Sequence, residues 1–253
     1  MARAALPPPA RGTTRAAPRS APVVDGRKKP RRGIVRRLVR FAFLVVFGFL
    51  ATCTLLLAAY RFVDPPATTV QLSGALGDAV RGERVGYAYD PVEESEQDAD
   101  IRHAVVASED ARFYSHAGFD FEEIRRARED AERRGRAPRG ASTLTQQLVK
   151  NLFLTTERSY VRKALEIPLT LAAELILPKE RILTLYLNVA EWGPGVYGIE
   201  AAAAHHYGTD ADALSRNQAA RLAAVLPNPA ERDPSDMGRT AARIQTRMGQ
   251  MGW

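Results

Sequence analysis

The chain has 253 residues, which we expect to hold one globular domain of ordinary size with appendages, without room for a second catalytic domain. Its formal net charge of +7 is concentrated at one end: residues 1–40 carry 12 Lys and Arg against one acid, Asp25, and the remainder is at −4. The basic balance therefore does not indicate a nucleic-acid partner for the folded part. The only cysteine, Cys53, excludes a disulfide, a thiolate metal site and a cysteine nucleophile from the residues that follow it.

The N-terminal segments predict a tail and an anchor. Residues 1–37 are rich in Pro, Ala and Arg without apolar periodicity, which is typical of a disordered tail. Phe41 to Tyr60 is an uncharged run of 20 residues, about 30 Å of helix, and predicts a transmembrane helix over 38–61. A cleaved signal peptide is the alternative, but its apolar region usually has only about 7–15 residues. The positive-inside rule keeps the tail in the cytoplasm and places the rest outside.

Residues 62–100 read as a linker or membrane-proximal segment with one or two strands, because Pro and Gly interrupt short apolar runs. The pattern of 101–253 is nearly all helical, which predicts a single, mainly α domain. We expect helices over 103–115, 120–134, 143–154, 159–177, 182–192, 215–226 and 237–251, with caps at Asp120, Ser142, Ser159 and Ser215.

Four polar features lie within these core-like helices. Glu109 and Asp110 share a segment with apolar residues, so burial could raise the pKa of one carboxyl into the range of a general base; a solvated helix face is the alternative. Residues 140–151 form a Gly loop that leads into a helix N-terminus, an arrangement that can bind phosphate or sugar hydroxyls. An ordinary capped helix would explain Ser142 and Thr143 but not the Gln and Lys-Asn pairs that follow.

The other two features have ordinary explanations when they are taken singly. Arg158, Arg162 and Glu166 have i, i+4, i+8 spacing, and together with Lys163 suit either a pyrophosphate site or a surface ion pair. Glu200 lies in an Ala-rich run, where we expect it to accept structural hydrogen bonds. The adjacent pair His205 and His206 has no third ligand nearby and does not predict a zinc site.

Together these segments resemble the peptidoglycan glycosyltransferase family, and within it the monofunctional biosynthetic enzymes. The resemblance covers about residues 104–229 and rests on five ordered motifs: EDARFYSHAGFD, GASTLTQQLVKN, RKALE, KERILTLYLN and GVYGIEAAAAHHYG. It implies a lysozyme-like, mainly α glycosyltransferase fold behind the transmembrane helix. It also implies polymerisation of lipid II into β-1,4-linked glycan strands for the bacterial cell wall, with inversion and release of undecaprenyl pyrophosphate.

The resemblance also assigns residues. It makes Glu109 the catalytic base and Glu166 the second catalytic acid of the cleft, which positions the donor pyrophosphate or its cations. The substrate-binding residues that it implies are Ser142, Thr143, Gln146, Gln147, Lys150, Asn151 and Arg158.

No cofactor is required by the resemblance; Asp110 is a candidate ligand for a divalent cation, Mg or Mn, and no resident metal site is expected. The implied partners are lipid II, the growing lipid-linked chain, the membrane and other proteins of cell-wall synthesis and division, with no nucleic acid. The expected location is the bacterial inner membrane.

Two other functions remain as alternatives to the glycosyltransferase. One is a lytic enzyme of lysozyme-like fold, which has no use for the pyrophosphate cations, and the other is a non-catalytic scaffold.

Overall fold

A computed structural model describes residues 32–82, 86–137, 140–155, 157 and 159–253. The chain divides into two units, residues 1–43 and 44–253, and the site described below lies entirely in the second. Helix α1 (Arg32–Tyr60) contains the predicted apolar run. By length and composition it could cross a membrane.

The second unit is mainly α-helical, which confirms the expected fold class. After α1 the helices are α2 (Thr69–Arg81), α3 (Ala99–Glu109), α4 (Phe121–Arg134), α5 (Leu144–Phe153), α6 (Tyr160–Ile176), α7 (Lys179–Val189), α8 (Ile199–Tyr207), α9 (Arg216–Val225) and α10 (Gly238–Gln250). Short 3₁₀ turns occur at Glu94–Glu96, Phe113–Ser115, Ala211–Ala213 and Pro234–Asp236.

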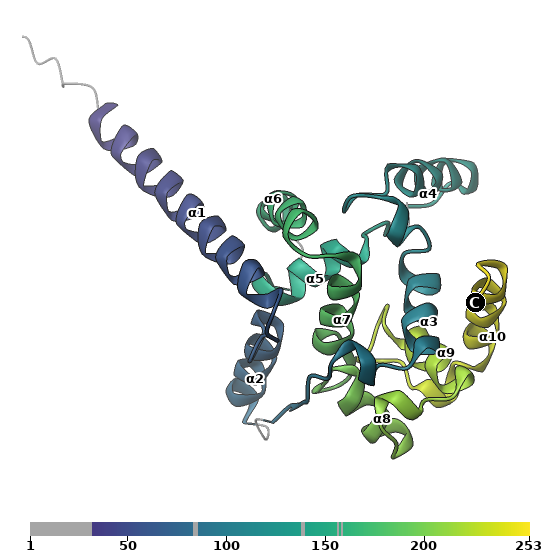
Figure 1. Ribbon diagram of the computed structural model, residues 1–253. Coiled ribbons are helices and arrows are strands. Elements are labelled where there is room, and N and C mark those ends of the chain that lie inside the picture. The colour runs from purple at the N-terminus through teal and green to yellow at the C-terminus, as the bar shows by residue number, and fades with distance from the viewer. Residues whose placement is uncertain (1–31, 83–85, 138–139, 156, 158) are drawn as a thin grey trace, which may run out of the picture. The chain divides into compact units, whose positions relative to one another are not determined.

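Two groups of helices surround the core. Helix α3 packs against α9 and α10, and α5 packs against α6 and α7 (Figure 1). The largest fully buried side chains are Trp192, Tyr186 and Phe113. Because burial of an aromatic side chain contributes strongly to stability, these residues help to fix the helices that carry the polar site.

A small sheet has the strand order β1-β3-β2, with β1 (Ala88–Tyr89) parallel and β2 (Glu191–Gly193) antiparallel to β3 (Val196–Tyr197). A tight turn joins β2 to β3, and Gly195 in it has a φ of 72°. Left-handed backbone of this kind favours glycine because it lacks a Cβ.

The segment 62–100 contains β1, in line with the one or two strands expected there, and also α2, a helix that the sequence did not predict and whose N-terminus has a capping box of Thr68 and Gln71. Three expectations about helices were wrong. The helix expected over 182–192 ends at Val189, and strand β2 follows it. Helix α3 ends at Glu109 and does not continue to residue 115, because the next residue leaves the helical conformation at a φ of −157°. The cap of α5 is Thr143 and not Ser142, since Thr143 pairs with Gln146 in a capping box.

The other capping predictions are confirmed. The side chain of Asp120 accepts a hydrogen bond from the backbone of α4, Ser159 caps α6, and Ser215 caps α9. Each of these side chains satisfies an N–H group that has no partner within its helix.

Candidate active site

Glu109 occupies the last position of α3 and lines a cleft of about 590 Å³. Residues from five places in the sequence surround this cleft: Ser108–Arg112, Asp120 with Glu123 and Arg126, Gly140–Thr143 with Gln147, Pro227, and Arg247. Because α3 ends at Glu109, residues 110–112 leave the helix and form part of the wall of the cleft beside it. Glu109 is thus one of the acids that line the cleft.

Asp110, which follows Glu109, is buried and holds three segments together. Its carboxylate accepts hydrogen bonds from His116 Nε2, at 2.9 and 3.1 Å, and from the Leu144 backbone N–H, at 3.0 Å. His116 Nδ1 accepts from the Gly118 N–H at 3.2 Å, so the ring proton lies on Nε2. This clamp fixes the end of α3 against the start of α5.

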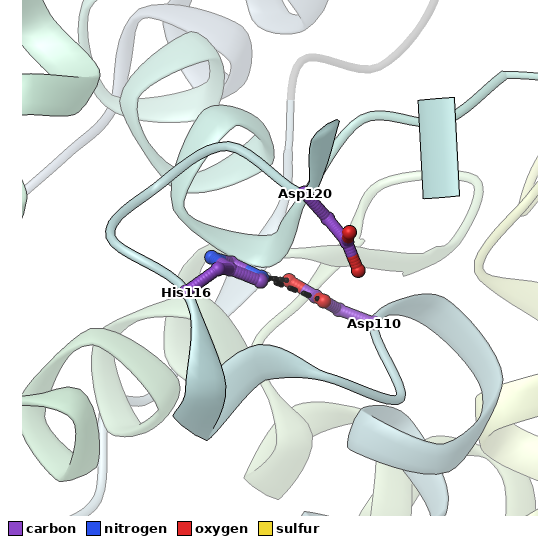
Figure 2. A group of neighbouring side chains, drawn as sticks. All are labelled: Asp110, His116 and Asp120. Atoms are coloured by element: carbon purple, nitrogen blue, oxygen red, sulfur yellow. Dashed lines mark hydrogen bonds and ion pairs between the residues drawn. The ribbon is translucent and has the colours of Figure 1, made fainter. Parts of the chain in front are cut away.

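Asp110, His116 and Asp120 point toward a common space (Figure 2), and their ligand atoms lie within 4.8 Å of one another. Asp120 accepts from the Glu123 backbone N–H at 2.9 Å as the cap of α4. Both ring nitrogens of His116 already have partners, so neither offers a lone pair to a cation. The hydrogen bonds thus fit a structural clamp and do not fit a metal site.

Gly118 lets the loop before α4 approach α6 closely. Its φ is +86°, and a Cβ added there would lie 2.7 Å from Thr170 Cγ2. The Gly118 carbonyl accepts a hydrogen bond from Thr143 Oγ1 at 2.7 Å. Thr143 is thereby connected both to this loop and to the first turn of α5.

Gln147 connects Glu109 to the buried core. Its Nε2 donates to Glu109 Oε2 at 3.0 Å, and its Oε1 accepts from the hydroxyl of Tyr186 on α7, also at 3.0 Å. Burial raises the pKa of Tyr186 well above its ordinary value, so this hydroxyl stays protonated and donates. The chain of hydrogen bonds fixes which way the Gln147 amide faces, and so the position of the Glu109 carboxylate.

Burial raises the pKa of Glu109, while the Gln147 hydrogen bond and the nearby positive charge of Lys150 oppose that rise. A carboxylate with this combination is more basic than an exposed one but can still be ionised. A raised pKa brings the acid closer to the operating pH, as a general base requires.

A group of basic side chains surrounds the second predicted acid. Glu166 on α6 is 2% exposed and accepts from Arg162 Nη1 at 2.9 Å and from Lys163 Nζ at 2.5 Å. Burial, and next the charge of Arg162, lower the pKa of Lys150, which also interacts with Glu109 and Glu166. The arrangement gathers three cations around Glu166, and none of these four residues is among the described residues that line the cleft.

The structure brings most of the sequence-predicted residues together, but these residues differ in exposure and in hydrogen-bond partners. Ser142 is exposed at the cleft and Gln147 contacts Glu109, whereas Thr143 and Gln146 are buried and bond to each other's backbone at the start of α5. Asn151 is 9% exposed on the same helix. Arg158 lies outside the described residues.

Sequence reasoning did not identify several residues of the site as functional. Arg112, Arg126 and Arg247 line the cleft, and Tyr186 orients Gln147. In the sequence these residues resemble ordinary charged or core residues of helices. Only their contacts with distant parts of the chain identify them as residues of the site. Glu200 accepts from the Ala211 N–H at 2.8 Å, which confirms its structural role.

Comparison with known proteins agrees with this site. The sequence model of the transglycosylase family matches residues 83–252. The chain belongs to the transglycosylase family. It is 44% identical over 225 residues to a biosynthetic peptidoglycan transglycosylase of Chromohalobacter salexigens and 43% identical over 223 residues to one of Pseudomonas aeruginosa. Each alignment covers 87% of this chain and 96% of the relative.

Family membership confirms two expectations made from the motifs. The chain is a glycosyltransferase, and its catalytic domain has the lysozyme-like fold. The N-terminal apolar helix, predicted from its composition, is compatible with a membrane anchor. The transglycosylase match contains all of α3 to α10, and so contains Glu109, Gln147 and Glu166.

We expect Tyr186→Phe to lower the rate of this glycosyltransferase by roughly two- to twelvefold, the worth of one net hydrogen bond. Without the hydroxyl, the Gln147 amide loses the contact that orients it toward Glu109. Because the Gln147 bond lowers the pKa of Glu109, the acid limb of the pH–rate profile should move to higher pH. A profile whose acid limb does not move would contradict this role.

Proposed function

We propose that this glycosyltransferase builds the glycan strands of peptidoglycan for the bacterial cell wall, with lipid II and the growing lipid-linked chain as substrates. Glu109 takes the proton from the 4-hydroxyl of the acceptor sugar, which attacks the anomeric carbon of the donor. The bond to undecaprenyl pyrophosphate breaks and a β-1,4 linkage forms with inversion. Family membership and the names of the relatives support peptidoglycan as the product class.

The observation that carries the proposal is an acid that lines a cleft and is also influenced by the charge of a nearby lysine. Glu109 lines the cleft, and Lys150 lies close enough to influence its pKa. A base beside an open cleft can receive an acceptor hydroxyl. The nearby cations can stabilise a leaving group whose negative charge grows as the glycosidic bond to phosphate breaks.

In this mechanism Glu166 is a positioning residue for the leaving-group site. Its buried carboxylate holds Arg162 and Lys163, and these two cations together with Lys150 and Arg158 bind the donor pyrophosphate. A planar guanidinium suits a phosphate because it can donate two parallel hydrogen bonds. This group of cations thus has its positive charge in place before the substrate binds.

The remaining predicted residues have two kinds of role in the proposal. Ser142 and Gln147 face the substrate, since the first is exposed at the cleft and the second contacts the base. Thr143 and Gln146 fix the loop that carries Ser142, through their capping box. Asn151 lies one residue beyond Lys150 on α5 and supports the donor side of the site.

Membrane anchorage follows from the substrate. The lipid part of a lipid-linked sugar is held in the bilayer. An enzyme anchored at the membrane surface therefore encounters this substrate more often than an enzyme free in solution. We propose a single-pass protein of the inner membrane, with a cytoplasmic tail at 1–37, a span at 38–61, a membrane-proximal segment at 62–100 and a glycosyltransferase domain at 101–253 on the outer side. The excess of Arg and Lys before the span supports this orientation. Other proteins of cell-wall synthesis and division are candidate partners.

A lytic enzyme of the same fold is the second candidate, because it also needs one acid and a sugar-binding cleft. It has no use for a buried Glu166 that holds two cations, since a lytic reaction on a glycan strand releases no pyrophosphate. The cation group therefore favours synthesis.

The deciding experiment supplies the intact protein in detergent with lipid II and separately with preformed glycan strands. Polymer together with free undecaprenyl pyrophosphate would support the proposal. Shortened strands without any polymer from lipid II would overturn it in favour of the lytic enzyme, and binding of lipid II without turnover would indicate a scaffold.

A further inference from the structure

Arg247 is a cleft residue supplied by the C-terminal helix. It lies on α10 and lines the same cleft as Glu109. Its Nη1 donates to the carbonyl of Ala107 at 2.8 Å, across 140 residues of sequence. Because Ala107 is two residues before Glu109 on α3, this bond fixes the guanidinium beside the end of the helix that carries the base.

Arg247 differs in its ion pairing from the other arginines that line the cleft. Arg112 forms ion pairs with Glu122 and, at 3.7 Å, with Asp120, and Arg126 pairs with Glu122. Over the described residues, no carboxylate lies within ion-pair distance of Arg247. A guanidinium has five N–H donors, so its bond to one carbonyl leaves several for a ligand.

The direction of attack decides which substrate would meet Arg247, and this step rests on the proposed function. In an inverting displacement the nucleophile approaches the anomeric carbon from the side opposite the leaving group. The proposed function assigns the leaving group to the cations around Glu166, and none of these is among the described residues that line the cleft. On that assignment the acceptor occupies the cleft, which Arg247 also lines.

We propose that Arg247 binds an anionic group of the acceptor substrate, either a phosphate of its lipid carrier or a carboxylate of its peptide. The contact positions the acceptor so that its 4-hydroxyl faces Glu109. Both groups are oxyanions that a guanidinium binds with two parallel N–H donors, so both satisfy the same geometry.

A purely structural role for Arg247 makes a different prediction. A cation near the C-terminus of a helix stabilises that helix by contact with its last carbonyls, and Arg247 makes such a contact with α3. If that were its whole role, substitution would lower Tm and leave the affinity for the acceptor unchanged.

The test measures acceptor kinetics apart from donor kinetics. A lipid-linked disaccharide whose 4-hydroxyl is blocked serves only as donor and is held at saturation, while lipid II is varied as acceptor. We expect Arg247→Gln to raise the acceptor KM roughly 10- to 100-fold with little change in kcat, and Arg247→Lys to restore part of the loss. Arg221→Gln is the matched control, because Arg221 also donates to backbone carbonyls, Pro234 O at 2.8 Å and Ser235 O at 2.7 Å, but lies outside the cleft.

A second acceptor, with the peptide carboxylates converted to amides, separates the two anion sources. If Arg247 binds a peptide carboxylate, amidation raises the KM of the parent to that of Arg247→Gln and has no further effect on the variant. If it binds a phosphate, amidation leaves the ratio between parent and variant unchanged. An unchanged acceptor KM in Arg247→Gln, with polymer still made by the parent, overturns this inference alone; a parent that makes no polymer overturns the proposed function instead.

Discussion

Replacing Glu109 with Gln is expected to lower the rate of glycan polymerisation by roughly 10²–10⁴-fold, the usual contribution of a general base. The amide has nearly the shape of the carboxylate but cannot accept a proton from the acceptor hydroxyl. Glu109 lies at the end of α3 and lines the cleft, and the amide oxygen of Gln can still accept the hydrogen bond from Gln147 Nε2. Polymer formation and release of undecaprenyl pyrophosphate, measured with Tm for each protein, check the expectation.

The matched control is Glu200→Gln, because Glu200 also lies on a helix and accepts a hydrogen bond but is outside the cleft. The parent should also lose activity as the pH falls through the pKa of Glu109, since only the ionised carboxylate accepts a proton. Burial raises that pKa, so the acid limb should lie above the ordinary value for glutamate of about 4.3. Retention of full activity by Glu109→Gln would exclude Glu109 as the base.

Glu166→Gln should lower the rate of polymerisation by about 10²-fold, through the leaving-group side of the reaction. The neutral amide cannot hold both Arg162 and Lys163, which the carboxylate holds at 2.9 and 2.5 Å. Two cations that lose their fixed positions stabilise the departing pyrophosphate less well. Single-turnover rates with a saturating donor would report this loss directly.

Glu174→Gln is a close control for that experiment. Glu174 is on the same helix and also accepts from two groups, Thr145 Oγ1 at 2.5 Å and Lys179 Nζ at 2.8 Å, but it is not part of the proposed site. Both variants leave a cation partly uncompensated, so both should lower the free energy of unfolding. If the two variants lose activity equally, the effect of Glu166 is one of stability and not of the leaving group.

The helices that carry the site could largely be predicted from the sequence. Caps at Asp120, Ser159 and Ser215, and the apolar spacing that follows each, are local signals, because a helix forms its hydrogen bonds between residues four apart. The same reasoning missed α2 and misplaced the end of α3. In α2, glycines within the segment suggested a loop, although a capping box and packing against α5 support the helix.

The early end of α3 shows why some features could not be predicted. Apolar periodicity continues past Glu109, and nothing nearby in sequence breaks it. The interruption comes from Asp110, whose carboxylate accepts from His116 and from the Leu144 N–H, 34 residues away. A buried carboxylate must find such partners, and only the packing of α5 against this region supplies them.

The sequence by itself determined the long apolar helix, the mainly α domain and, through its ordered motifs, the family, and it predicted the two candidate acids, because these depend on composition, local periodicity and the spacing of motif residues. The tertiary structure decided which polar groups meet. The Tyr186–Gln147–Glu109 chain and the Arg247 contact join residues 38 to 140 positions apart, and such pairs come together only when the buried faces of separate helices pack. Burial by the same packing raises the pKa of Glu109, so the chemistry of the site is a property of the folded domain.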